Sequence, residues 1–509
     1  MKKAFELLFH RVTMLSFLIL IQLYLLFSFL VEFNRFFSTF ALFSSLISFV
    51  VALIIINSNN NQASKISWLV VMLVLPLVGG FLYLLYGKTH LSKSQQQRIK
   101  QLQQVYKDHL NVEPLVNQTF IEEYPHWQAM TSYLENQANA SLHYLDDATY
   151  YSSGEDFFED LLVEIKKAQS FIFMQYFILA KGEMWNEILE VLKQKAREGV
   201  VVRVLYDDVG SIFRLPANYH KKLRRFNIEC HVFNPLTPIA SIQHNHRDHR
   251  KLTVIDGKIG FVGGINIGDE YINRVNKYGH WKDTAAKIAG YSVDSLTKIF
   301  LTTWQYVTKN TQEDTKHFFN HAIAQQNKGY VQAFSDSPLD DEAVGENLFL
   351  STLLQARKYV YMMTPYLIIS QEMISACCIA AKSGVDVRIY MPGIPDKKTV
   401  FMVSQSNYKP LLEAGVKIFE YNPGFLHAKS MVADDEIALL GTINLDYRSL
   451  YLHFENAALF IGHPIVKDIK KDTLYVESQS KQVDMQFIQK ASLTTKLAQV
   501  LLKIVTPLL

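Results

Sequence analysis

Three apolar runs dominate the beginning of the chain. They cover residues 13–31, 36–56 and 66–86. A helix of about 20 apolar residues crosses the roughly 30 Å of hydrocarbon in a bilayer, whereas a cleaved signal peptide has a shorter apolar core and no second run close behind it. The pattern therefore predicts two or three transmembrane helices within residues 1–87, and an integral, multi-pass membrane protein.

Basic residues flank these runs on both sides. Three precede the first run, and five follow the third, namely Lys88, Lys93, Arg98, Lys100 and Lys107. Basic flanks favour the cytoplasm, yet three full spans would place the two flanks on opposite sides. Either one run lies in the membrane interface or re-enters the membrane, or the rule fails here; we expect catalytic domains that face the cytoplasm. Residues 88–130 are predicted to be a basic juxtamembrane linker, which either contacts anionic lipid or is solvated.

From residue 131 onward the sequence contains an internal repeat. The string AREGVVVR at residues 196–203 recurs as AKSGVDVR at residues 381–388. In both copies a short apolar run and a helical pattern lead to a glycine that ends the helix, and a valine-rich strand follows, which together make a βαβ unit. We therefore predict an α/β protein with two pseudo-twofold-related domains, at residues 131–335 and 336–509, behind the transmembrane region.

Each predicted domain carries the same polar string. Residues 249–266 and 427–444 both fit the pattern H-x-K-x4-D-x6-G-[G/T]-x-N. Histidine and lysine two positions apart project from one face of an extended strand. One match is weak evidence, but two matches on corresponding strands of a repeat strongly indicate a site at the shared face of the domains. The residues of the pattern are His249, Lys251, Asp256 and Asn266 in the first copy and His427, Lys429, Asp434 and Asn444 in the second.

These residue types suit displacement at a phosphodiester. Negative charge builds on the phosphate oxygens during the reaction, and the two lysine ammonium groups and two asparagine amides would bind those oxygens. One imidazole can attack phosphorus to form a phosphohistidine, while the other protonates the leaving alcohol and then deprotonates the incoming one. With these groups in place we expect neither a metal nor a cofactor.

Composition argues against other classes of function. The chain has 51 Lys and Arg against 48 Asp and Glu, a formal net charge of +3, which gives no strong field for nucleic acid. Its three cysteines, Cys230, Cys377 and Cys378, have no spacing typical of zinc or of a disulfide framework. We therefore expect no nucleic-acid partner. A non-catalytic membrane scaffold is disfavoured as well, because it would have no reason to keep both histidine–lysine pairs.

The paired strings resemble the HKD motifs of the phospholipase D superfamily, and the resemblance covers nearly the whole of the sequence after the apolar runs. It implies a two-domain fold, a phosphohistidine intermediate and independence of metal. It also implies that His249 is the nucleophile and His427 the acid, although the residues alone do not separate these two roles.

The same resemblance implies supporting carboxylates. In this superfamily a downstream carboxylate orients each catalytic histidine, which implies Asp283 for the first-motif histidine and Glu455 for the second-motif histidine. The motif aspartates, Asp256 and Asp434, are expected to be structural hydrogen-bond partners within the site.

Within the superfamily the sequence is similar to the bacterial cardiolipin synthases. The similarity lies in the apolar region that ends at Gly87, in motif segments such as NHRDHRK and GGINIGDEY, and in the chain end TPLL. It implies a bacterial plasma-membrane enzyme that joins two phosphatidylglycerol molecules, releases glycerol and contacts anionic lipid. One departure is Gln175, at a position where the resemblance leads us to expect an acid.

The sequence leaves alternatives open. A membrane-bound phospholipase D that hydrolyses phospholipid to phosphatidic acid would use the same residues with water as acceptor, and a membrane-tethered nuclease would use them on nucleic acid. The sequence does not determine acyl-chain preference, oligomeric state or the use of phosphatidylethanolamine as a donor.

Overall fold

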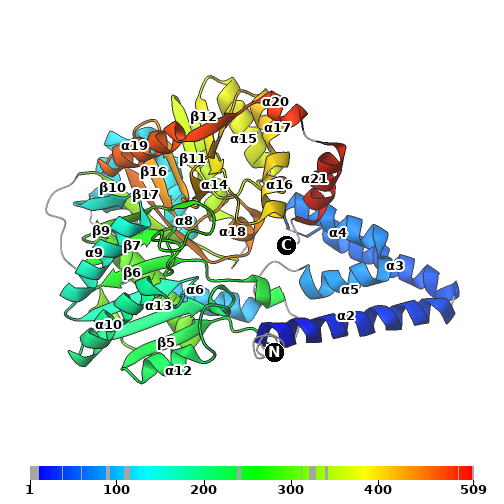
Figure 1. Cartoon of the computed structure of the whole chain (residues 1–509), viewed down its shortest axis with the longest axis horizontal. Helices are drawn as coiled ribbons and strands as arrows, with labels where there is room; N and C mark the ends of the chain where they lie inside the picture. The colour runs from blue at the N-terminus through cyan, green and yellow to red at the C-terminus, as the bar shows by residue number, and fades with distance from the viewer. Residues whose placement is uncertain are drawn as a thin grey trace.

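The computed structural model describes residues 11–36, 38–58, 60–87, 92–107, 115–237, 242–310, 312–319, 328–338, 342–490 and 492–506. Two sheets with helices packed on them form the bulk of the protein, and helices from the beginning of the chain lie to one side (Figure 1). Lys2, Lys3 and Lys88, among the basic flanks considered above, and the chain end at residues 507–509 lie outside the described residues.

The first sheet is formed by the first half of the repeat. It has seven strands in the order β2-β9-β7-β6-β3-β4-β5. Strands β3, β4 and β5 are parallel and β6 is antiparallel to β3, so the start of β6 lies at the sheet edge where β3, β4 and β5 end. The bounds are Ala148–Tyr151 (β2), Phe171–Tyr176 (β3), Val201–Asp207 (β4), Ile228–Phe233 (β5), Lys251–Ile255 (β6), Ile259–Gly263 (β7) and Ala285–Ala289 (β9).

The second sheet repeats this arrangement. Its nine strands follow the order β1-β10-β17-β16-β15-β11-β12-β13-β18, in which β17 to β13 take the places of β9 to β5 in the first sheet. The bounds are His143–Tyr144 (β1), Tyr330–Asp336 (β10), Tyr359–Met363 (β11), Asp386–Pro392 (β12), Lys417–Tyr421 (β13), Ser430–Ala433 (β15), Ile437–Gly441 (β16), Glu455–Ile461 (β17) and Ser480–Val483 (β18). A short ribbon of β8 (His280–Lys282) and β14 (Gly424–Leu426) joins the two halves.

The predicted βαβ unit is present in both halves. Helix α10 (Glu183–Arg197) joins β3 to β4, and α15 (Gln371–Lys382) joins β11 to β12. Gly199 and Gly384 follow these helices with φ of +91° and +97°, a left-handed conformation that glycine adopts without a Cβ clash. The sequence strings that revealed the repeat are therefore the ends of two equivalent crossover helices with the strands that follow them.

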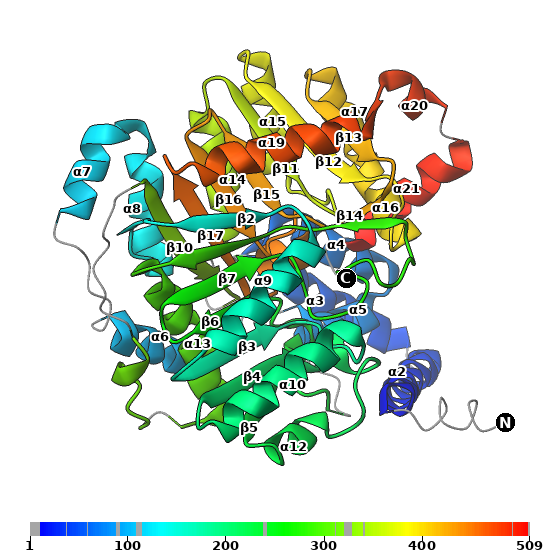
Figure 2. The same ribbon diagram turned by 60° about the vertical axis from the view of Figure 1, so that its left-hand side comes forward.

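The two sheets pack together through a shared core. One buried cluster includes Leu252 and Val262 from the first sheet and Leu440 and Phe460 from the second. Figures 1 and 2 show the first sheet, in green, below the second, in yellow and orange. The main helices around the two sheets are α9 (Gly154–Lys167), α13 (Ser292–Thr308), α14 (Val344–Gln355), α16 (Lys398–Ser406), α17 (Tyr408–Glu413), α18 (Tyr447–Tyr451), α19 (Ile465–Ser478), α20 (Met485–Gln489) and α21 (Leu493–Val505).

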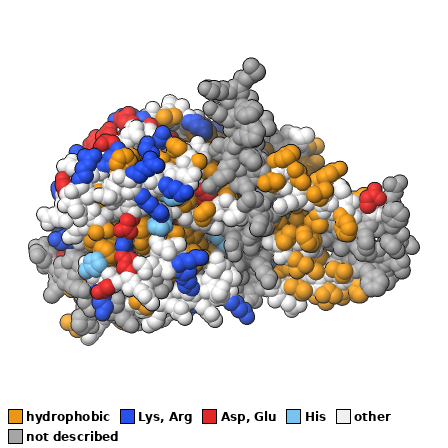
Figure 3. Space-filling view, turned by 90° about the horizontal axis from the view of Figure 1, so that it is seen from below, with side chains coloured by type: hydrophobic (Ala, Val, Ile, Leu, Met, Phe, Trp, Pro, Cys, Tyr) orange, Lys and Arg blue, Asp and Glu red, His pale blue; other side chains and the backbone are white. Residues whose placement is uncertain are grey.

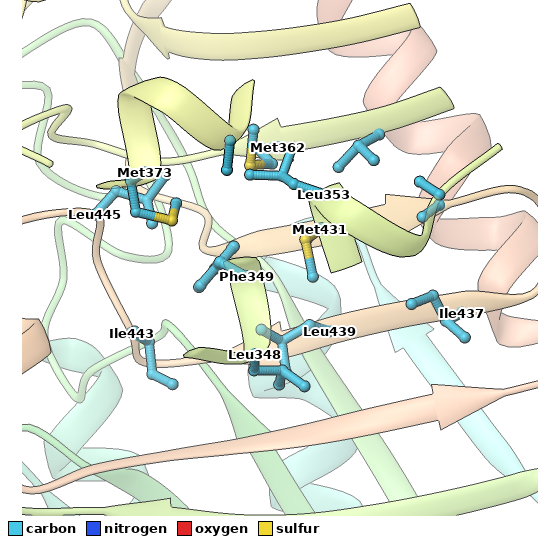
Figure 4. Close-up of a cluster of buried hydrophobic side chains, with 14 of the residues drawn as sticks. Leu348, Phe349, Leu353, Met362, Met373, Met431, Ile437, Leu439, Ile443 and Leu445 are labelled. Carbon is cyan, nitrogen blue, oxygen red and sulfur yellow. The ribbon is translucent and has the colours of Figure 1, made fainter. Parts of the chain in front are cut away.

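A second apolar cluster lies on the other face of the second sheet. Figure 4 shows Leu348 and Phe349 of α14 among Met362, Met431 and Leu439 of the strands. Burial of such side chains removes apolar surface from water, at about 25 cal/mol per Å². Both faces of the central strands are therefore covered, which explains why the sequence reads there as continuous apolar runs.

The beginning of the chain forms α2 (Arg11–Phe36), α3 (Ser38–Ile56), α4 (Gln62–Val74) and α5 (Pro76–Tyr86). The third predicted run is divided after Leu75, because Pro76 lacks a backbone N–H and begins a new helix. None of the helices in the described ranges is long and apolar enough to cross a membrane. The predicted transmembrane region is therefore wrong, and so is the integral, multi-pass plasma-membrane location with cytoplasm-facing domains. Exposed apolar side chains gather over these helices, at the right of Figure 3.

The segment between these helices and the first sheet packs onto both halves. Helix α6 (Lys93–Lys107) lies against α13 with Ile99 and Leu102 buried, and Arg98 donates to the carbonyl of Gln305 at 3.1 Å. Helices α7 (Val116–Glu123) and α8 (Gln128–Ala138) follow it, and α8 contacts β10 and α14. Much of the segment that was predicted to be a linker is therefore helical.

Candidate active site

The two motifs meet where the halves of the protein contact each other. His249 lies directly before β6, and its backbone N–H donates to the carbonyl of Phe454 in the second half at 2.9 Å. His427 lies between β14 and β15, and its N–H donates to the carbonyl of Lys282 in the first half at 2.7 Å. The backbone of the opposite half therefore aligns each motif strand.

Each motif histidine bonds a carboxylate from the opposite half. His249 Nδ1 lies 2.9 Å from Glu455 Oε2, and His427 Nδ1 lies 2.6 Å from Asp283 Oδ2. The pairing inferred from the superfamily, Asp283 with His249 and Glu455 with His427, is reversed here. The pairing of β8 with β14 explains the exchange. Asp283 directly follows β8 and His427 directly follows β14, so the parallel pair of strands places the two side by side. A carboxylate at Nδ1 leaves Nε2 of each ring as the nitrogen for chemistry.

Burial governs the charge of both histidines. It lowers the pKa of His427 to about 4, with a further lowering from Lys429, although Asp283 raises it through its charge and its hydrogen bond. Burial and then the charges of Lys251 and Lys429 lower the pKa of His249 well below its ordinary value. Both imidazoles are therefore neutral near pH 7.

The two motif lysines are buried and equivalent. Lys251 Nζ donates to the carbonyl of His249, and Lys429 Nζ donates to that of His427. Burial lowers the pKa of Lys251 to about 7 and that of Lys429 to about 8, while Glu455 and Asp283 raise both. The charge of Lys429 also lowers the pKa of Lys251, which shows that the two motifs form one electrostatic site.

The motif asparagines differ in their contacts. Asn266 Nδ2 donates to the Tyr271 hydroxyl at 2.7 Å, and its Oδ1 accepts from the N–H of Ile178 at 2.9 Å. Asn444 donates its backbone N–H to Ser449 Oγ at 2.8 Å, and its buried side-chain Oδ1 has no hydrogen-bond partner among the described residues. The ring of Tyr271, which sequence reasoning did not single out, lies 5.6 Å from that of His427.

The Gly-or-Thr position of the motif differs for a steric reason. A Cβ at Gly264 would lie 2.2 Å from Asp283 Oδ1, so only glycine allows that carboxylate to approach. At the equivalent position Thr442 donates its hydroxyl to Glu455, and Ser449 donates to the same carboxylate. Sequence analysis missed Thr442 and Ser449 as functional residues; the departure from glycine inside the second motif was the available indication for Thr442.

The motif aspartates bond to backbone and lie away from the histidine rings. Asp256 accepts hydrogen bonds from three consecutive N–H groups, those of residues 169–171, at 2.7 to 2.8 Å. Asp434 does the same for residues 357–359 at 2.7 to 2.9 Å. Each aspartate has a positive φ, +53° and +55°, which the turn after its strand requires. They tie the start of β3 and of β11 to the end of the adjacent motif strand.

Gln175, the departure noted in the sequence, bonds an acid. Its Nε2 donates to Asp248 Oδ2 at 2.6 Å, and both side chains are buried. A carboxylate in place of Gln175 would face Asp248 at this distance, and two like charges in a buried site repel strongly. The amide therefore fits its neighbour directly before His249.

One group of described residues has the donor atoms of a metal site. Ligand atoms of His249, His453 and Glu455 lie within 4.8 Å of one another. Two of these residues form the hydrogen-bonded pair described above, and the positive charges of Lys251 and Lys429 act on the same histidine. That field opposes a divalent cation and favours an anion.

Replacement of Asp434 tests the structural role of the motif aspartates. We expect Asp434→Ala to lower the free energy of unfolding by about 3 kcal/mol or more, because it leaves three N–H groups without an acceptor. Asp434→Asn keeps one acceptor oxygen and tolerates positive φ, so it should lose roughly half as much. Denaturant unfolding of the purified chain measures both. Two variants as stable as the parent would contradict this role.

Comparisons with known proteins agree with this geometry. The family described as the PLD-like domain of cardiolipin synthase matches residues 161–289 and 349–474, and one described as the phospholipase D-nuclease N-terminal region matches residues 46–88. Cardiolipin synthase 2 of Bacillus anthracis is 34% identical over 91% of this chain and 90% of its own length. A cardiolipin synthase of Geobacillus kaustophilus is 35% identical over 92% of this chain and 94% of its own length.

A solved structure shares the fold. The phosphatidylserine synthase of Haemophilus influenzae superposes with a TM-score of 0.57 at 17% identity, over 75% of this chain and the whole of that one. At this identity the likeness concerns the mixed α/β two-domain fold alone. Because both repeat halves match one family and the similarity to curated relatives extends over nine tenths of the chain, the protein belongs to the cardiolipin synthase family of the phospholipase D superfamily.

Proposed function

We propose that this protein is a cardiolipin synthase. It transfers a phosphatidyl group from one phosphatidylglycerol to the free headgroup hydroxyl of a second, and it releases glycerol. The named relatives and the family match support this activity. The observation that carries it is the pair of buried histidines, each bonded at Nδ1 to a carboxylate of the opposite half, beside two buried lysines.

In the first step His249 Nε2 attacks the phosphorus of the donor lipid. The bond between phosphorus and the oxygen of the headgroup glycerol breaks as the bond from phosphorus to nitrogen forms. His427 is protonated on both ring nitrogens once the anionic phosphodiester has raised its pKa, and it gives its Nε2 proton to the departing oxygen, so glycerol leaves as a neutral alcohol. The phosphatidyl group remains on His249.

In the second step the headgroup hydroxyl of another phosphatidylglycerol attacks the same phosphorus. His427 takes the proton of that hydroxyl, and the bond from phosphorus to nitrogen breaks. Cardiolipin leaves and both histidines return to their starting state. The sum of the two steps is two phosphatidylglycerols to one cardiolipin and one glycerol.

The surroundings of the two histidines support this assignment of roles. Asp283 raises the pKa of His427 through both charge and hydrogen bond, against burial, so His427 is the ring better able to hold a proton. At His249 burial and two lysine charges favour the neutral form, which is the nucleophile. An anionic phosphodiester in the site would raise the pKa of His427 further.

The lysines and asparagines bind the phosphate in this proposal. Lys251 and Lys429 stabilise charge on its oxygens, and the amides of Asn266 and Asn444 donate to them. The Nδ2 of Asn266 carries two N–H groups, so its bond to Tyr271 leaves one for a phosphate oxygen. None of these steps uses a metal or a cofactor.

The same proposal divides the chain into four parts. An amino-terminal region occupies residues 1–87, a connecting segment residues 88–130, and two phospholipase D-like domains residues 131–335 and 336–509. The equivalent strand orders of the two sheets support two such domains, although β1 and β10, which lie before residue 336 or end at it, pair into the second sheet. The two domains act as one unit, because each supplies the carboxylate for the histidine of the other.

Product analysis tests the reaction. Purified protein in mixed micelles with phosphatidylglycerol as the sole phospholipid is expected to release cardiolipin and glycerol in equal amounts. His249→Ala and His427→Ala should each lower the rate by about 10² to 10⁴-fold or more. Phosphatidic acid as the main product would make the protein a hydrolase, and the absence of any lipid product would favour a scaffold.

The crossed pairs predict two different defects. Asp283→Asn makes His427 a weaker acid and base, so the phosphatidyl adduct on His249 should form and turn over about 10²-fold more slowly but still be trapped. Glu455→Gln makes His249 a weaker nucleophile, so the adduct itself should fail to accumulate. Acid quench and mass spectrometry of the peptide that contains residue 249 measure the adduct. The opposite pattern would reverse the roles of the two histidines.

The lysine pKa values predict a loss of activity at alkaline pH. A lysine binds phosphate only in its charged form, which exists below its pKa, so kcat/KM should fall as pH rises through about 7 to 8. The value of kcat should fall only at a higher pH than kcat/KM does, because the bound phosphodiester stabilises the charged forms of both lysines and so raises their pKa values. Circular dichroism at each pH separates this effect from unfolding. A kcat/KM that stays constant up to pH 10 would contradict the assignment.

A further inference from the structure

A large cavity opens beside the first sheet, at the carboxyl ends of β4 and β5. Its volume is about 1400 Å³, above the roughly 300 to 1000 Å³ usual for small-molecule sites. Helix α6, the end of α13, α11 (Asp208–Ser211) and α12 (Tyr219–Arg224) complete its walls. Among the described residues that line it, neither motif histidine and neither motif lysine is present. The cavity is therefore separate from the paired-motif centre.

Fixed positive charge dominates the lining. Arg98, Arg224 and Lys309 line the cavity, against a single described carboxylate, that of Asp208. Asp208 Oδ2 already accepts the backbone N–H of Leu236 at 2.7 Å. Burial, and then Arg224 and other cations, lower the pKa of the lining residue His231 to about 4, in keeping with a positive local field. An anion is the ligand that such a field attracts.

Both arginines are held in place by the protein. Arg98 donates to the carbonyl of Gln305 and lies 5.8 Å from the centre of the Tyr306 ring. Arg224 donates from Nε and Nη2 to the carbonyl of Cys230, at 3.0 and 2.8 Å. A guanidinium that is fixed before binding loses less conformational entropy when it bonds a phosphate, and its planar fork suits phosphate oxygens.

Apolar side chains form the rest of the wall. They include Ile212, Leu215, Phe233, Val307 and Phe454. Figure 3 shows the lower face of the molecule, the side on which α12 and β5 lie in Figure 1, and there basic and histidine side chains lie beside apolar ones. A small phosphate ester would leave this apolar surface in water, whereas acyl chains would cover it.

We propose that this cavity is a second binding site, for one molecule of anionic phospholipid. Its phosphate bonds to Arg98 and Arg224, and its chains contact the apolar wall. The backbone carbonyl of the wall residue Phe454 accepts a hydrogen bond from the N–H of His249, and Phe454 directly precedes Glu455. The lipid therefore lies next to the strand that holds one histidine–carboxylate pair. The proposal concerns binding and does not depend on the reaction proposed above.

The test uses the full chain with both motif histidines replaced by alanine, so that no lipid is consumed. The probe is dihexanoyl phosphatidylglycerol below its micellar concentration. Modification of each arginine by phenylglyoxal, read by mass spectrometry, locates the ligand. We expect the lipid to protect Arg98 and Arg224 and to leave the neighbouring Arg225, which does not line the cavity, reactive. Unchanged modification of Arg98 and Arg224 would overturn the site.

Affinity measurements on matched variants complete the test. Arg98→Gln with Arg224→Gln should weaken binding at this site at least tenfold, while Lys100→Gln with Arg225→Gln, an equal charge change at positions that do not line the cavity, should not. Dihexanoyl phosphatidylcholine should bind at least tenfold more weakly, because its own cation competes with the arginines. Glycerol 3-phosphate should also bind at least tenfold more weakly. Equal binding of glycerol 3-phosphate would make a free phosphate ester the ligand and overturn the lipid assignment.

Discussion

The exchange of carboxylates between the two halves is the interaction on which the rest of the site depends. Glu455 and Asp283 are fully buried, and each faces a histidine that the opposite half supplies. A buried carboxylate without its partner costs several kcal/mol, so separation of the halves is disfavoured beyond the loss of apolar contacts. Neither motif is complete within its own domain, which explains why the repeat occurs as a pair.

The backbone around the site is arranged to hold this exchange. The N–H groups of His249 and His427 donate to carbonyls in the opposite half, and the β8–β14 ribbon runs beside one of these bonds. At the far ends of the motif strands, Asp256 and Asp434 each collect three backbone N–H groups. The histidine and the aspartate of one motif therefore fix opposite ends of the same strand. The lysine between them is held in a fixed position on that strand.

The distribution of charge matters more here than its sum. The whole chain is nearly neutral, yet two buried lysines converge on the paired motifs and two arginines line the neighbouring cavity. Burial of a lysine is costly and lowers its pKa, and the site retains the positive charge through Glu455 and Asp283. The same carboxylates thus orient the histidines and support the charge of the lysines.

The sequence by itself determined the features that depend on local order. Two βαβ units followed from a repeated helix end with its glycine and strand, and the paired motifs named the histidines and lysines that meet at the interface of the halves. These inferences hold because periodicity and residue chemistry are properties of neighbouring positions. Tertiary structure alone decided that Asp283 bonds His427 and Glu455 bonds His249, since strand pairing between halves leaves no trace in spacing. It also decided the division of the third apolar run at Pro76 and the need for glycine at residue 264, because a helix end and a close approach depend on what lies against the backbone in space.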